Sequence, residues 1–505
     1  MPPDIIMAGP KDTLQMIIEK QFESLPPIRL TQYRANLLRL QEETEGRIRL
    51  ATGCSGTDLV VKVLQLMVGL WQEFFGLSFR IEHVWSCDHG SVQQKFILEH
   101  FQPHYLFTSM EEVATSDTAY DLISGKHVTI ESFLVFATGI ECDTLSSLNR
   151  QKQIGESIVD KAEGKTGSSA RYTMQIVEKQ QPDLLLFECV RGLAAASKTS
   201  SSSPKLSDID TLIVWGNRLG YVFWCGLLEA TEFGSSTVRT RQYMVGFRCR
   251  DPDAHFTQLP VKNKNGEMEE LFELPSWHAE LSNMLGELKV APLPTAMHFL
   301  PLSDSRREIW RSYPMEGSVL KVTAAASEGN FVKSDRDPLW EADHLSKFTE
   351  VGIHWPPQFT DQFIEKTAHL CRRKAELVYF MEQTVPWDTL KHSYADINYT
   401  INWIKLATGK LKCLVGSSHV WCFGRALGTH HPSQEMAGVD LAPEEALALQ
   451  GWSLCSLSPT FIASTSPQEI RQQLQCKCFN GFRVRVFSYT VCFGCLQIAN
   501  GLFVT

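Results

Sequence analysis

The sequence predicts a doubly wound α/β domain with a mostly parallel sheet. Short apolar, strand-like runs alternate with helical patterns between residues 47 and 249, which is typical of a parallel sheet covered by helices. Several runs end in glycine or polar residues, as at Gly53, Asp88 and Glu188. Because parallel strands end at one edge of a sheet, these residues are expected to gather in a ligand-binding crevice.

Each element of this domain has its own signal. Helical spacing of apolar residues marks two helices within 11–45, separated by the helix-breaking pair Pro26-Pro27. Alternation of polar and apolar residues marks many of the strands. The elements expected next are, in order, a strand at 47–51, a helix at 59–75, a strand at 79–86, a helix carrying Phe96 and Phe101, strands at 104–107 and 133–137, a helix at 168–179, a strand at 182–188, a helix at 208–219, and strands at 221–228 and 241–247.

The rest of the chain is organised differently. A chain of 505 residues is too long for one hydrophobic core, so more than one domain is expected. Periodicity is poor from 250 to 430, where prolines, tryptophans and charges are scattered, and this stretch is interpreted as a second, irregular domain. A clear helical signal returns at 442–450, with Pro443 in the first turn and Gly451 at the end.

The composition excludes several classes of protein. A hydrophobic fraction of 43% and a charged fraction of 21% are typical of a globular protein, and no apolar run is long enough to span a membrane. The start of the chain lacks the features of a signal peptide. The 14 scattered cysteines favour free thiols in a reducing compartment. The net charge of −9 argues against a uniformly basic protein and is compatible with a local basic cleft for nucleic acid.

The turn after the first strand has the composition of a nucleotide-type cofactor site. Its small residues let the backbone approach a ligand, and the following helix offers free N–H donors. An ordinary strand-to-helix turn is the alternative. Asp88, after the next strand, is placed to bind ribose hydroxyls or, alternatively, to cap a helix. The residues of the turn are Gly53, Cys54, Ser55, Gly56, Thr57 and Asp58.

Four further residues carry reactive or charged side chains. Cys142 follows an apolar run that breaks at a glycine, so it is a candidate nucleophile, with a buried structural cysteine as the alternative. Glu188 ends a predicted strand, where a helix cap or a surface ion pair is an ordinary role for a carboxylate. Arg239 and Arg241 alternate on a strand, as residues of a solvated face also do.

Taken in chain order, these motifs resemble those of the cytosine carbon-5 DNA methyltransferase family, in the divergent form found in some unicellular eukaryotes. The resemblance covers residues 48–248 and 437–482. The matching segments are Gly53 to Asp58 with the glycine cofactor loop, Asp88 with the ribose-binding acid, Cys142 with the catalytic cysteine, Glu188-Cys189-Val190 with the Glu-Asn-Val triplet, Phe233 to Arg241 with the Gly-Val-Pro-Gln-x-Arg-x-Arg pattern, and Leu441 to Trp452 with a late helix.

The resemblance implies a Rossmann-like, S-adenosylmethionine-dependent methyltransferase fold with an inserted target-recognition domain. Ser109 and Met110 fall where the family contacts the cofactor adenine. No metal is expected, because one of the two cysteine pairs near the C-terminus has the wrong spacing for a zinc knuckle. The implied segments are an N-terminal helical segment at 1–46, a cofactor-binding catalytic domain at 47–249, a variable target-recognition domain at 250–430 and a return to the catalytic domain at 431–505.

The implied activity is methyl transfer from S-adenosylmethionine to carbon 5 of cytosine in DNA, in the nucleus, with no membrane partner. Cys142 would add to carbon 6 of the ring, and Glu188 would stabilise charge near ring nitrogen 3. Arg239 and Arg241 would hold the base and nearby phosphates. The nucleotide would be flipped out of the duplex to reach this site.

Several positions depart from the family pattern and leave two alternatives open. Glu141 replaces the proline before the cysteine, Cys189 replaces the asparagine of the triplet, and Cys476-Lys477 replaces a late Gly-Asn pair. A carboxylate beside a thiol disfavours the thiolate. One alternative is therefore a catalytically decayed protein that binds nucleic acid or cofactor. The other is methylation of RNA, which one branch of the family carries out.

Overall fold

The computed structural model describes most of the α/β part of the chain and portions of the remainder. The predicted nucleophile Cys142, most of the predicted late helix and the segment 474–482 lie outside the described residues. The described residues are 13–141, 159, 164–194, 207–235, 237–249, 257–262, 268–273, 275–291, 340–367, 369–390, 393–408, 410–412, 418–423, 438–441, 446 and 449.

A nine-stranded sheet lies at the centre of the α/β part. Its strands are β1 (Arg47–Gly53), β2 (Arg80–Cys87), β3 (Tyr105–Phe107), β4 (Thr118–Asp121), β5 (Lys126–Thr129), β6 (Val135–Gly139), β7 (Leu184–Cys189), β8 (Tyr221–Glu229) and β10 (Thr240–Arg248). They follow the order β5-β4-β3-β2-β1-β6-β7-β10-β8. The strands from β3 to β7 in this order run parallel, and β10 lies antiparallel between β7 and β8. The doubly wound, mostly parallel sheet predicted from the sequence is therefore confirmed.

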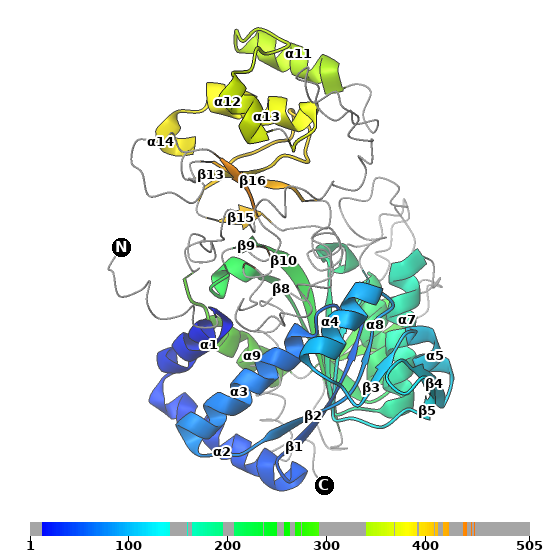
Figure 1. Cartoon of the computed structure of the whole chain (residues 1–505). Coiled ribbons are helices and arrows are strands. Elements are labelled where there is room, and N and C mark those ends of the chain that lie inside the picture. Colours follow the sequence, from blue (N-terminus) through cyan, green and yellow to red (C-terminus); the bar gives the residue numbers. More distant parts are fainter. Residues whose placement is uncertain are drawn as a thin grey trace.

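Helices cover both faces of this sheet and enclose two apolar cores (Figure 1). One core lies under α1 (Thr13–Ser24), α2 (Pro27–Thr44), α3 (Leu59–Phe75), α4 (Ser91–His100) and α9 (Pro275–Glu287). The other lies under α5 (Met110–Thr115), α7 (Gly164–Gln180) and α8 (Asp208–Arg218). Because both faces are covered, the central strands are almost wholly buried, which explains their nearly continuous apolar sequences.

Local sequence signals set the ends of these helices. α3 ends at Gly76, whose φ of 70° is the left-handed conformation that glycine adopts without strain. α8 begins with a capping box, in which the Ser207 hydroxyl accepts from the Asp210 N–H and the Asp210 carboxylate accepts from the Ser207 N–H. Two orphan donors at the start of α8 are thereby satisfied.

One part of the sheet was missed by the sequence prediction. β4 and β5 form an antiparallel hairpin that extends the sheet beyond β3. Each strand has four residues, which is too short for a clear alternation signal. Asp121 organises the turn, because its carboxylate accepts from the backbone N–H groups of Leu106 at 2.9 Å and Ser124 at 2.8 Å. These hydrogen bonds outweigh the effect of burial and lower the pKa of Asp121.

A second group of elements forms at the opposite end of the molecule from α1 and α2 (Figure 1). It has the helices α11 (Trp340–Glu350), α12 (Asp361–Thr367), α13 (Arg372–Thr384) and α14 (Trp387–Leu390). These pack on a small sheet in the order β14 (Ala407–Thr408), β13 (Ser393–Asp396), β16 (Val420–Cys422) and β17 (Val439–Asp440). Trp421 of β16 is fully buried between them. The stretch that the sequence left structurally undefined therefore contains a small α/β unit.

One strand pair in the described residues joins this region to the segment between β8 and β10. β15 (Leu411–Lys412) pairs in parallel with β9 (Thr237–Val238), directly before the first of the two predicted site arginines. An antiparallel hairpin of β11 (Thr257–Lys262) and β12 (Met268–Glu273) leads into α9. The apolar face of α9 packs in the same core as α1, and the Gln21 side-chain amide donates to the Leu288 carbonyl at 2.9 Å.

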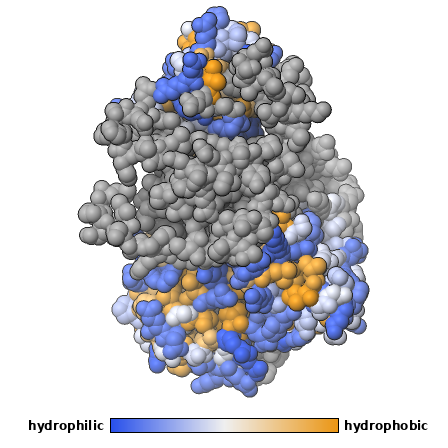
Figure 2. Space-filling view, viewed as in Figure 1, coloured by the Kyte–Doolittle hydropathy of each residue, from blue (hydrophilic) through white to orange (hydrophobic). Residues whose placement is uncertain are grey.

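The described surface is mixed in character. Figure 2 shows apolar residues gathered over the N-terminal helices, where Ile28 and Phe74 are exposed. None of the helices in the described ranges combines the length and the hydropathy needed to cross a lipid bilayer.

Candidate active site

The carboxyl ends of four neighbouring strands bring most of the predicted site residues together. β1 ends at Gly53, directly beside the last residue of β2. β6 ends at Gly139, which lies beside Glu188 of β7. Cys142 follows Gly139 by three residues in the chain, although its own position lies outside the described residues. The glycine turn, Asp88, the start of the cysteine segment and Glu188 therefore share one edge of the sheet.

The glycine turn adopts a conformation with three positive φ angles. These are 46° at Cys54, 60° at Gly56 and 47° at Asp58. The Gly56 N–H donates to Asp88 Oδ2 at 2.8 Å, and the Gly90 N–H donates to Oδ1 at 2.9 Å. Asp88 therefore fixes the turn against the end of β2. The alternative that Asp88 caps α4 is wrong, because the N-cap residue of α4 is Gly90.

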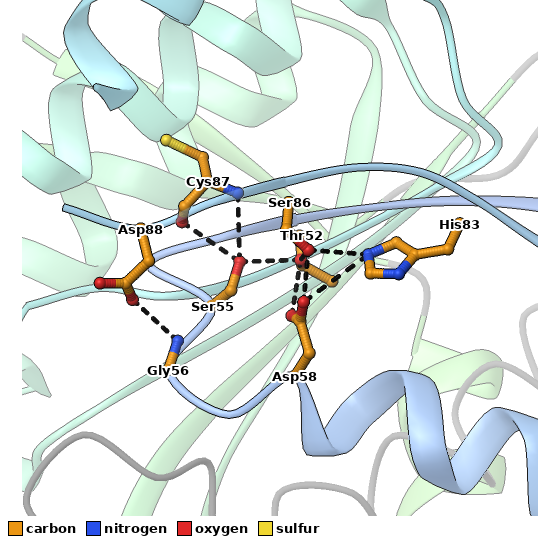
Figure 3. A network of polar contacts seen from close by, with 8 residues as sticks. All are labelled: Thr52, Ser55, Gly56, Asp58, His83, Ser86, Cys87 and Asp88. Atoms are coloured by element: carbon orange, nitrogen blue, oxygen red, sulfur yellow. Dashed lines mark hydrogen bonds and ion pairs between the residues drawn. The ribbon is translucent and has the colours of Figure 1, made fainter. Parts of the chain in front are cut away.

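A buried polar network lies beneath the turn (Figure 3). Thr52 Oγ1 donates to Asp58 Oδ1 at 2.7 Å, and the Ser86 hydroxyl donates to Asp58 Oδ2. Ser86 Oγ lies 2.8 Å from His83 Nε2, and Ser55 Oγ lies 2.8 Å from Thr52 Oγ1. The Asp58 carboxylate therefore points toward Thr52 of β1 and Ser86 of β2. Direct contact between Asp58 and a cofactor, as expected from the sequence, would require this carboxylate to leave both partners.

Burial controls the charge states of this network. Burial raises the pKa of Asp58 to about 7, against the opposing effect of the hydrogen bonds from Ser86 and Thr52. Burial also lowers the pKa of His83 to about 3, so this imidazole is neutral at physiological pH. Near pH 7, the network has no permanent positive charge to balance an ionised Asp58.

Met110 lies against the first glycine of the turn. A Cβ atom added to Gly53 would lie 2.8 Å from Met110 Cε and 3.1 Å from Thr138 Oγ1, so only glycine leaves Met110 its present place. Ser109, the other residue predicted to contact the cofactor adenine, is the N-cap of α5. Its hydroxyl accepts from the Glu112 N–H at 3.2 Å. The turn and the end of β3 thus meet through Gly53 and Met110.

Glu188 and Arg241 form a buried ion pair. Arg241 Nε lies 3.1 Å from Glu188 Oε1, and the side chains are 15% and 2% exposed respectively. Tyr243 lies directly opposite Glu188 in the antiparallel ladder of β7 and β10 and is fully buried. Burial raises the pKa of Tyr243, so its phenol stays protonated. The carboxylate predicted to contact a base ring is therefore held by one of the two predicted arginines.

The segment that carries both arginines is fixed through backbone and side-chain contacts. The Arg239 N–H donates to Glu229 Oε1 at 2.7 Å, and the Thr240 hydroxyl donates to Glu229 Oε2 at 2.5 Å. Thr237 Oγ1 donates to the Leu449 carbonyl at 3.2 Å, in the predicted late helix. Arg239 itself is only 5% exposed. Arg239 and Arg241 are thus not on the solvated face that was one interpretation of their alternation.

Glu141, the residue before Cys142, turns toward the cofactor side of the edge. Its Oε1 lies 3.5 Å from Nδ1 of His89, which follows β2. Its N–H donates to Ser169 Oγ on α7 at 3.1 Å. The backbone of Glu141 is therefore held by Ser169, and its carboxylate lies against His89.

Five side chains with a place in this site were not found from the sequence. His83 and Ser86 are polar residues in a buried strand directly before Asp88, and that placement was an available signal. His89 directly follows Asp88, and that placement was also an available signal. Glu229 and Tyr243 gave no signal, because only the pairing of distant strands brings them to the site. Within the described part of the chain, no group of three or more His, Cys, Asp or Glu side chains is arranged to hold a metal ion.

The strand order, the glycine turn after β1 and the carboxylate after β2 define the class of protein as a Rossmann-like methyltransferase fold. Comparison with known proteins adds a partial match to one family. Residues 120–298 match the family model described as C-5 cytosine-specific DNA methylase. This part of the chain is thus similar to the family that the ordered motifs resemble.

A curated relative has a similar sequence. The DNA (cytosine-5-)-methyltransferase DMT5 of Cryptococcus neoformans is 26% identical over 243 residues, which are 46% of this chain. The matched part is only 9% of the length of that relative.

Solved structures with similarity to the chain include the S. pombe Dnmt2 methyltransferase, with 12% identity and a TM-score of 0.41. That match covers 88% of this chain and 98% of the other. The Entamoeba histolytica methyltransferase EhMeth has 10% identity and a TM-score of 0.41, with 89% and 98% of the two chains covered.

Proposed function

We propose that the protein transfers a methyl group from S-adenosylmethionine to carbon 5 of cytosine in DNA. The observation that carries this proposal is the pairing of Gly139 with Glu188. It starts the Cys142 segment beside the carboxylate that would contact the same base. A nuclear location is part of the same proposal and rests on the resemblance to eukaryotic members of the family.

The residues at the first two strand ends fit S-adenosylmethionine. The turn offers backbone close to a ligand, because a side chain at Gly53 would collide with Met110. Asp88 lies against the turn, where a ribose is held in related nucleotide sites. We propose that the turn from Gly53 to Thr57, Asp88 and Met110 hold the cofactor, while Asp58 and Ser109 support their positions. When bound, S-adenosylmethionine supplies the methyl group.

The remaining residues have separate tasks in the proposed reaction. The Cys142 thiolate forms a bond to carbon 6 of cytosine, which makes carbon 5 nucleophilic. Glu188 contacts ring nitrogen 3 and the exocyclic amine and stabilises the charge that develops there. After methyl transfer, loss of the proton on carbon 5 expels the cysteine. Arg241 pairs with Glu188, and the backbone of Arg239 is fixed in the same segment, which supports a role of both arginines in orienting the base.

Covalent trapping tests this function. Duplex DNA containing 5-fluorocytosine blocks the loss of the group on carbon 5, so an active enzyme with cofactor remains attached to the DNA. We expect a stable adduct with the wild type and with Cys225→Ala, a cysteine on β8 away from the strand ends. No adduct is expected with Cys142→Ala. Equal absence of adduct with the wild type and Cys142→Ala, with cofactor bound, would refute the proposal.

The same preparation separates the two alternatives. A decayed relative would bind S-adenosylmethionine in calorimetry and give no 5-methylcytosine with any substrate. An RNA methyltransferase would label folded RNA and leave duplex DNA unmodified. We expect labelled methyl transfer from S-adenosylmethionine to duplex DNA in preference to folded RNA.

A further inference from the structure

The polar network beneath the glycine turn connects three elements of the proposed cofactor site. Thr52 belongs to β1, Ser86 and His83 belong to β2, and Asp58 is the N-cap residue of α3. Asp58 makes no capping hydrogen bond, since its carboxylate is directed at the two hydroxyls instead (Figure 3). This side chain is therefore placed to hold the turn and not to stabilise the helix.

The network is enclosed and lacks a counter-charge. Asp58 is 1% exposed and His83 is 7% exposed. In the described ranges, His83 is the one basic group within 4 Å of the carboxylate, at 3.7 Å, and it is neutral. Of the other titratable groups that face the network, Cys54 in the turn and Cys87 and Asp88 at the end of β2 are acidic, and His104, directly before β3, faces His83. An ionised Asp58 would therefore be a buried charge that receives two hydroxyl hydrogen bonds but that no opposite charge within 4 Å in the described ranges balances.

We propose that Asp58 is a positioning residue of the cofactor site that acts in its protonated form, so that loss of its proton loosens the glycine turn and weakens cofactor binding. This inference rests on the proposed binding of S-adenosylmethionine at the turn. The free-energy cost of ionising Asp58 inside the closed network falls when water enters. Water can enter only if the segment from Thr52 to Asp58 moves away from β2. That movement would break the contact between Gly56 and Asp88.

The pH range of this effect follows from the environment of the carboxyl group. Burial raises the pKa of Asp58 to about 7. The protonated fraction then falls from about nine-tenths at pH 6 to about one-tenth at pH 8, so affinity should fall about tenfold over this range. His104, before β3, lies near His83 and contributes to keeping it neutral throughout.

Calorimetric titration with S-adenosylmethionine at pH 6 and pH 8 tests the proposal. The wild type and the control Asp117→Asn, whose carboxylate is almost fully exposed, should both bind about tenfold more weakly at pH 8. Asp58→Asn has the shape of the protonated acid and cannot ionise. It should bind with the wild-type affinity of pH 6 at both pH values. Titration of the ligand itself cancels, because it affects all three proteins equally.

Other outcomes would overturn the proposal. The proposal fails if the affinity of the wild type changes with pH no more than the affinity of Asp58→Asn does. It also fails if Asp58→Asn binds weakly at pH 6. If the wild type does not bind S-adenosylmethionine at any pH, the proposed function fails while the charge state of Asp58 stays testable in thermal unfolding. The wild type should then lose stability relative to Asp58→Asn as the pH rises from 5 to 7. A difference in stability between the two proteins that stays constant from pH 5 to pH 7 would refute the protonated state of Asp58.

Discussion

The buried ion pair between Glu188 and Arg241 gives a prediction about stability that needs no substrate. Arg241→Met removes the guanidinium and leaves a carboxylate that is 2% exposed. Breaking one side of a buried pair in this way typically costs 3–5 kcal/mol. Because Arg241 is itself 15% exposed, water can partly replace it, so we expect a cost of about 3 kcal/mol. Glu188→Gln should lower the free energy of unfolding by a similar amount, because it leaves the Arg241 guanidinium without its carboxylate partner.

A double-mutant cycle in urea measures the coupling between the two residues. Arg241→Met combined with Glu188→Gln leaves no unpaired charge, so it should cost about 2 kcal/mol less than the sum of the single changes. Arg47→Met is the matched control, because Arg47 pairs with Glu45 at 2.7 Å on the exposed surface. Its cost should stay below about 0.5 kcal/mol. Additive effects of the two buried changes would refute a direct interaction between Glu188 and Arg241.

Two further changes test other contacts. Gly53→Ala should displace the flexible Met110 side chain and weaken S-adenosylmethionine binding about tenfold, as calorimetry would detect. No loss of affinity in this variant would contradict the contact. Asp440 accepts from the Nε2 atoms of His369 and His419 at 2.6 Å each, and these histidines lower its pKa well below the usual value against the effect of burial. Asp440→Asn should therefore lower the free energy of unfolding, measured in urea at pH 7, by about 2 kcal/mol. This loss should shrink as the pH falls below about 4, and a loss independent of pH would contradict the charged state of Asp440.

The sequence was sufficient to predict the sheet and the edge that holds the site. A parallel strand that is buried on both faces can be recognised from its own apolar run. The end of that run can be located without knowing which strands lie beside it. Gly53, Asp88 and Glu188 could be assigned to one crevice because every parallel strand ends at the same edge. The hairpin of β4 and β5 was missed because each of its strands has four residues, which is too short for a clear alternation signal.

The directions of individual side chains could not be predicted in the same way. Asp58 stands in a turn whose residues were expected to face a ligand, and its φ of 47° directs its carboxylate under the turn instead. The pairing of Arg241 with Glu188 depends on the register between β7 and β10, and this register cannot be derived from a single sequence. Both outcomes depend on contacts between distant segments.

Glu141 shows how such a contact changes the meaning of a sequence departure. A carboxylate directly before Cys142 should oppose formation of a thiolate, if its charge acts on the sulfur. The structure directs that charge to His89, at 3.5 Å, on the segment that follows β2. When His89 is protonated, its charge balances the carboxylate there and reduces the repulsion of a nearby anion. Loss of the proline therefore does not by itself imply loss of the nucleophile. His89 also directly follows Asp88, so the same contact joins the proposed cofactor strand to the start of the cysteine segment.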